Sequence, residues 1–66
     1  MDIKEIREKR EQLERDLYSA NEKLISEFQK ETGVNVGRVD VNLGLIETIG
    51  EPNRYIVMNV GVDLDI

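Results

Sequence analysis

The sequence contains no cysteine, no histidine and no tryptophan, and only one proline. Without cysteine there is no disulfide and no thiolate metal site, and without histidine there is no imidazole ligand. Nucleophilic catalysis of the Ser-His-Asp or Cys-His kind is excluded for the same reason. The five glycines are spread out and form no phosphate-binding loop. We therefore expect no enzymatic activity, no cofactor and no metal site.

Positive charge and long apolar runs are also scarce. There are 14 acidic and 9 basic residues, which gives a net charge of −5. Nucleic acids and anionic membrane surfaces attract clusters of Lys and Arg, so we expect neither as a partner. No apolar run is long enough to cross a bilayer, and the first residues, Met-Asp-Ile-Lys-Glu, do not resemble a signal peptide. We expect a cytoplasmic location.

A chain of 66 residues is near the lower size limit for a single domain. A domain of this size buries roughly 60% of its unfolded surface. Its core rarely supplies more than about 3–5 kcal/mol of stability without a disulfide, a metal or a partner. Since the first two are excluded, association is the remaining source of stability. We predict one domain, residues 1–66, that forms a homodimer or a larger homo-oligomer.

Residues 2–32 have the pattern of one amphipathic helix. Apolar residues recur three, four or seven apart, at Ile3, Ile6, Leu13, Leu17, Ala20, Leu24 and Phe28. Asp2 followed by Glu5 resembles a capping box, and Gly33 suits the left-handed residue that ends a helix. No proline or glycine interrupts this interval.

The apolar stripe of this helix also follows a heptad. One seam position holds Ile3, Arg10, Leu17, Leu24 and Glu31, and the other holds Ile6, Leu13, Ala20 and Glu27. A helix of about 31 residues is roughly 46 Å long, whereas strands of about ten residues reach about 33 Å. We expect the helix to extend beyond its sheet and to pair with a second copy as a short coiled coil. The predicted interface residues are Ile3, Ile6, Leu13, Leu17 and Ala20. Arg10 within the seam favours a crossing or antiparallel arrangement in which it meets a glutamate.

Residues 38–66 have the alternation of an antiparallel β-hairpin. Apolar residues occupy every second position at Val39, Val41, Leu43 and Leu45, and again at Ile56, Met58, Val60, Val62, Leu64 and Ile66. Turn-forming residues 50–53 separate the two strands, and residues 35–37 are expected to form a turn or a short rim. The predicted fold is α+β, one long N-terminal helix followed by a two-stranded hairpin, completed into a larger sheet and helix layer by oligomerisation.

Two registers of the hairpin are possible. A four-residue loop places Asp40 opposite Asp63, which brings two like charges together. A tighter register places Arg38 opposite Asp63 instead. We favour the looser loop, combined with a β-bulge near Leu45 and Ile46.

Polar residues share the other predicted face of the hairpin. Asp40, Asn42, Asp63 and Asp65 could bind a partner or a hard cation, although a solvated face is the more common meaning of such a pattern. Tyr55 beside Val57 is expected on the same outer face, either as a partner anchor or as a cross-strand packing pair.

These features favour a non-enzymatic protein–protein interaction or structural protein that acts as a homo-oligomer. One alternative is a small inhibitor, of the type encoded by phages and mobile elements, that occupies a basic surface of a host nucleic-acid-binding protein. A second alternative is a small-ligand binder whose pocket forms between subunits.

Overall fold

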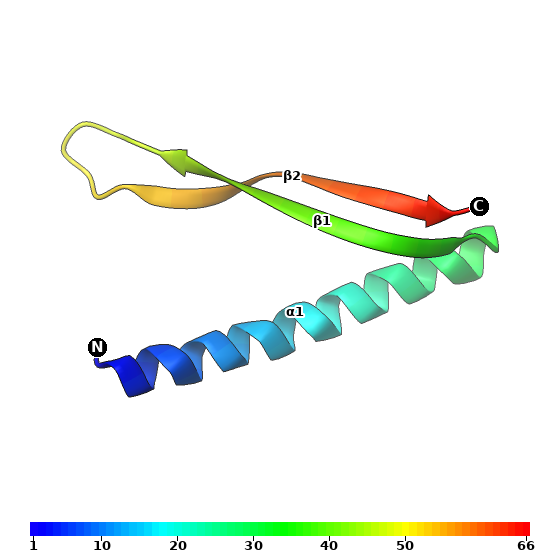
Figure 1. Cartoon of the computed structure of the whole chain (residues 1–66), viewed down its shortest axis with the longest axis horizontal. Helices are drawn as coiled ribbons and strands as arrows, with labels where there is room; N and C mark the ends of the chain where they lie inside the picture. The colour runs from blue at the N-terminus through cyan, green and yellow to red at the C-terminus, as the bar shows by residue number, and fades with distance from the viewer. The chain divides into compact units, whose positions relative to one another are not determined.

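The computed structural model describes all 66 residues as one helix and one hairpin (Figure 1). Helix α1 is Ile3–Thr32, strand β1 is Asn35–Ile46 and strand β2 is Arg54–Asp65. The two strands form an antiparallel two-stranded sheet. The chain divides into two compact units, Met1–Gly33 and Val34–Ile66. The predicted α+β fold, a long helix followed by a hairpin, is confirmed.

The ends of α1 are fixed by the residues that the sequence indicates. The Asp2 carboxylate accepts a hydrogen bond of 2.8 Å from the backbone N–H of Glu5. At the other end Gly33 has a φ of 73°, and its N–H donates to the Gln29 carbonyl at 2.9 Å. Only glycine adopts this left-handed conformation without strain, so the helix stops there.

The hairpin has a register different from the favoured one. Arg38 pairs with Asp63, and Asp40 pairs with Gly61. The prediction that Asp40 lies opposite Asp63 is therefore wrong, and the observed pairing replaces a repulsion between carboxylates with an attraction. The loop is also longer than residues 50–53, because the strands end at Ile46 and resume at Arg54.

Two β-bulges interrupt the register. Gly37 has no partner in β2, and Met58 has none in β1. The predicted bulge near Leu45 and Ile46 is therefore wrong in position. The bulge at Gly37 keeps Val36 on the same side as the apolar residues that follow, so residues 35–37 belong to the strand and not to a turn.

The strands are longer than the ten or so residues that the predicted length difference assumes. Each strand has 12 residues, and at about 3.3 Å per residue a strand of that length spans about 40 Å. The 30 residues of α1 correspond to about 45 Å. The two lengths nearly match, so length alone does not require a second chain.

The two faces of the hairpin follow from the register, because paired residues project to the same side. One side, here called the apolar face, carries Val36, Val39, Val41, Leu43, Leu45, Tyr55, Val57, Val60, Val62 and Leu64. The other side has two parts. Its polar part carries Arg38, Asp40, Asn42, Asn59, Asp63 and Asp65, and nearer the loop it carries an apolar cluster of Ile46, Ile56 and Met58. The loop half of the hairpin therefore carries apolar residues on both sides, with Arg54 beside Ile46 at its end.

Candidate interaction surfaces

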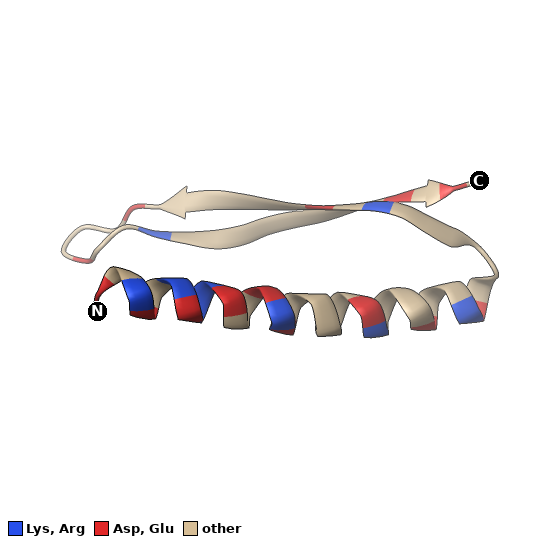
Figure 2. Ribbon diagram, turned by 60° about the horizontal axis from the view of Figure 1, so that its bottom comes forward, with Lys and Arg blue, Asp and Glu red and all other residues tan.

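The apolar stripe of α1 is the first exposed surface. No residue of the helix is buried. Most residues of the stripe keep a large part of their accessible surface, for example 38% for Phe28 and 68% for Ile3, and Ile25 beside them is half-buried. Charged residues crowd the first half of α1, where five basic and six acidic residues fall within positions 1–16 (Figure 2). The five predicted interface residues, Ile3, Ile6, Leu13, Leu17 and Ala20, are all exposed and on this stripe.

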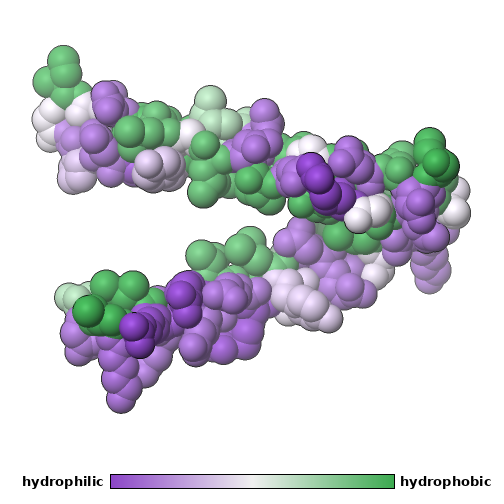
Figure 3. Space-filling model, in the orientation of Figure 1, coloured by the Kyte–Doolittle hydropathy of each residue, from purple (hydrophilic) through white to green (hydrophobic).

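The apolar face of the hairpin is the second exposed surface. Val41, Val60 and Val62 are each more than half exposed, and hydrophobic residues are visible at the surface along the hairpin, among hydrophilic ones, in Figure 3. A single two-stranded sheet has no opposing layer of its own to cover such a face. Ten apolar side chains on one side form a larger patch than the isolated apolar residues found on most protein surfaces.

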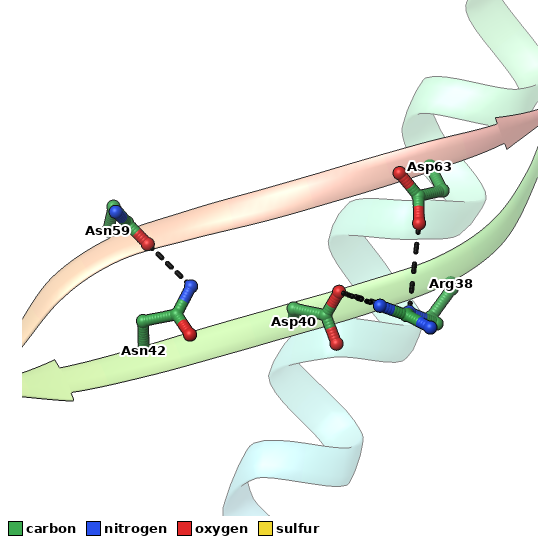
Figure 4. Close-up of polar contacts among 5 residues, drawn as sticks. All are labelled: Arg38, Asp40, Asn42, Asn59 and Asp63. Atoms are coloured by element: carbon green, nitrogen blue, oxygen red, sulfur yellow. Dashed lines mark hydrogen bonds and ion pairs between the residues drawn. The ribbon is translucent and has the colours of Figure 1, made fainter.

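The polar part of the hairpin is organised by side-chain pairs (Figure 4). The Arg38 guanidinium donates to the Asp40 carboxylate at 2.7 Å and forms an ion pair with Asp63 at 3.6 Å. One step closer to the loop, the Asn42 amide donates to the Asn59 side-chain oxygen. The register thus brings Asp40, Asn42 and Asp63 onto one face as predicted, with Asp65 beyond them at the end of β2.

These carboxylates are arranged around an arginine. No group of three acidic side chains in the structure has the arrangement of a metal site. Arg38 lies between Asp40 and Asp63. A hard cation bound by the same two carboxylates would occupy this position. The guanidinium therefore takes the position of the counter-ion.

Tyr55 lies on a different face from the one predicted. It pairs with Leu45, and its neighbour Val57 pairs with Leu43. Both side chains therefore belong to the apolar face and not to the acidic one. The reason is the bulge at Met58, which reverses the alternation for the rest of β2 towards the loop. The cross-strand pair with Leu45 agrees with the packing role considered for Tyr55.

Sequence reasoning missed the apolar cluster of Ile46, Ile56 and Met58. A side chain added at Gly44 would overlap Met58, so the thioether lies directly over this glycine. Ile46 and Ile56 are half-buried. The signal was present in three consecutive apolar residues, Ile56 to Met58, because a regular strand with one wet face does not place three in a row.

Comparison with known proteins finds no matching family model, no similar curated protein and no similar solved structure. Although α1 has 30 residues, no part of it is apolar enough to cross a membrane.

Proposed function

We propose that this protein is a non-enzymatic interaction or structural protein that works as a homo-oligomer. One observation supports the proposal above all others: the chain contains no buried side chain, apolar or polar. An isolated helix and an isolated two-stranded hairpin are each marginal in water. Covering the apolar surface of each unit would add stability, and a second copy carries both kinds of surface.

The polar part of the hairpin is suited to stay at the surface of such an assembly. Its carboxylates are solvated, with Asp40 about half exposed and Asp63 about 72% exposed at the side chain. Charged residues are depleted at the centre of protein interfaces and tolerated at the rim. We therefore assign Asp40, Asn42, Asp63 and Asp65 to the outside of the oligomer, where they can contact a protein partner in the cytoplasm.

The inhibitor alternative needs an acidic surface that imitates phosphates. Arg38 weakens this reading, because it neutralises part of the charge at the centre of the acidic group. The interaction role that does not depend on phosphate mimicry is the one we favour.

The proposal is tested by measuring mass and stability over a dilution series. Light scattering and sedimentation equilibrium should give a dimer or larger species at micromolar concentration. The melting temperature should fall on dilution, because association stabilises only the folded chain. Calcium, magnesium and a panel of nucleotides serve as controls and should leave the melting temperature unchanged. A chain that stays monomeric and melts cooperatively at the same temperature over a hundredfold dilution would contradict the proposal.

A further inference from the structure

The seam of α1 has an internal symmetry. Between Ile6 and Phe28 its positions are Arg10, Leu13, Leu17, Ala20, Leu24 and Glu27. Leu13 lies four residues before Leu17, and Leu24 lies four residues after Ala20. The only two charged positions, Arg10 and Glu27, lie seven residues outside the same central pair and carry opposite charges. If the seam is followed from its C-terminal end instead, the apolar residues fall at the same positions, and Arg10 and Glu27 take each other's places.

We propose that α1 pairs antiparallel with α1 of a second copy, in the single register that sets Arg10 of each helix opposite Glu27 of the other. A two-fold axis midway between Leu17 and Ala20 produces this arrangement. Leu17 then faces Ala20 of the second copy, and Leu13 faces Leu24. The inference rests on the proposed homo-oligomer and specifies the surface that forms it.

The charges select this orientation over a parallel one. In a parallel pair, identical residues face each other across the seam, so Arg10 would meet Arg10 and Glu27 would meet Glu27. Both contacts are repulsive and partly desolvated. In the antiparallel register the same four charges form two attractive pairs. Since charges at the centre of a helix pair matter more than charges at its rim, the antiparallel register is favoured.

Within one chain, Arg10 and Glu27 are both free enough to form ion pairs with a second helix. Arg10 contacts its own Glu14 at 3.4 Å, but both side chains are about two-thirds exposed, and such pairs add little stability. Glu27 forms no ion pair within the chain. Ala20 at the centre, with its small side chain, allows the helices to approach closely. At the ends, Ile6 meets the stem of Glu31, whereas Ile3 falls beyond the opposite helix.

Charge exchange tests the register. Arg10→Glu and Glu27→Arg should each weaken the dimer about tenfold or more, because each turns two attractions into two repulsions. The double variant should bind within about threefold of the original chain, because the pairs are restored with reversed sign. Arg15→Glu with Glu22→Arg is the matched control, since these residues lie on the opposite side of α1. Helix content by circular dichroism identifies any variant that fails to fold.

Cysteine cross-linking gives an independent reading, because the chain has no cysteine of its own. Leu13→Cys combined with Leu24→Cys should form a disulfide-linked dimer on oxidation, and neither single variant should. Cross-linking of the dimer by Leu13→Cys alone, or no effect of Arg10→Glu, would contradict the proposed register but not the proposal that the chain forms a homo-oligomer. A chain that is monomeric by light scattering would overturn both.

Discussion

In α1 every backbone hydrogen bond joins residues four apart, whereas the hairpin joins Asn35 at one end of its unit to Asp65 at the other. The helix depends on short-range features, namely a cap at each end and an uninterrupted run of helix-forming residues. The hairpin depends on pairings across many residues and contains two bulges. The comparison shows that one small chain can combine a locally determined element with one whose faces are set by distant residues.

The two units nevertheless expose similar surfaces. Each is amphipathic, and neither contains a buried side chain. In α1 the apolar surface is a single stripe. In the hairpin it covers one face throughout and continues onto the second face near the loop, where Ile46, Ile56 and Met58 lie. Substitutions on the two units should therefore differ in how many positions are sensitive as well as in how much stability each one removes.

The largest effect is expected at the centre of the helix stripe. Leu17→Glu places a charge where the proposed oligomer makes apolar contact, and should destabilise that assembly by about 3 kcal/mol or more. We expect loss of the oligomer together with loss of helix content, measured by light scattering and far-UV circular dichroism. Leu13→Glu, in the first half of the helix where charged residues are most frequent, should dissociate the oligomer with a smaller loss of helix. Equal loss of helix in the two variants would show that the two positions contribute equally to helix stability.

On the hairpin, two adjacent positions separate the faces. Val41 pairs with Val60 on the apolar face, and Asn42 pairs with Asn59 on the polar part. Val41→Asp should cost about 2–3 kcal/mol if the proposed oligomer covers this face, because it brings a carboxylate into an apolar surface. Asn42→Asp should cost under about 0.5 kcal/mol, since the exposed Asn59 amide can turn over and donate its N–H to the new carboxylate in place of accepting from Asn42. Denaturant unfolding of both variants measures the contrast, and similar losses would show that the faces are assigned incorrectly.

A further substitution probes the cluster near the loop. Gly44→Val introduces a side chain into the position of Met58. Because Met58 is 62% exposed and can turn towards solvent, the overpacking should cost only about 1 kcal/mol. Met58→Ala removes the obstructing thioether, so the double variant should recover part of the loss. Thermal unfolding of the two single variants and the double variant gives the coupling. Additive losses would mean that Met58 does not lie over Gly44 in solution.

The smallest effect is expected among the exposed ion pairs. Arg38→Ala removes the contacts to Asp40 and Asp63, but the Arg38 side chain is 68% exposed. The loss should be under about 1 kcal/mol and should shrink as salt is added. Arg54→Ala, at the other end of the same face, is the control for removal of one positive charge. A loss of several kcal/mol at Arg38 would place this face inside an interface.

The sequence was sufficient for α1 because its signals are local. Asp2 and Gly33 mark the two ends, and the apolar period between them has no competing interpretation. The strands were also recognisable, since alternation of apolar and polar residues is a local signal too. The alignment of one strand on the other is not a local signal. Loop length favours Asp40 opposite Asp63, whereas electrostatic repulsion between the two carboxylates opposes it, and the structure has the register that avoids the repulsion.

The bulges explain the remaining errors at the candidate surfaces. Simple alternation assigns Val57 to the outer face and Met58 to the inner one. An unpaired residue at Met58 exchanges these assignments for every residue between it and the loop, including Tyr55. The location of a bulge depends on how both strands fit together, here on the absence of a side chain at Gly44 beneath the thioether. A single strand read alone does not contain that information.

The unpaired state of Met58 also makes chain length adjustable at that point. Removing this one residue would leave all other cross-strand partners as they are, because Asn59 would still pair with Asn42 and Val57 with Leu43. Removing any paired residue nearby would instead shift the partners on one side of the cut and turn their side chains over. A codon deletion at Met58 is thus the rare shortening of a strand that the sheet can absorb, and related chains could differ in length there while keeping the same two faces.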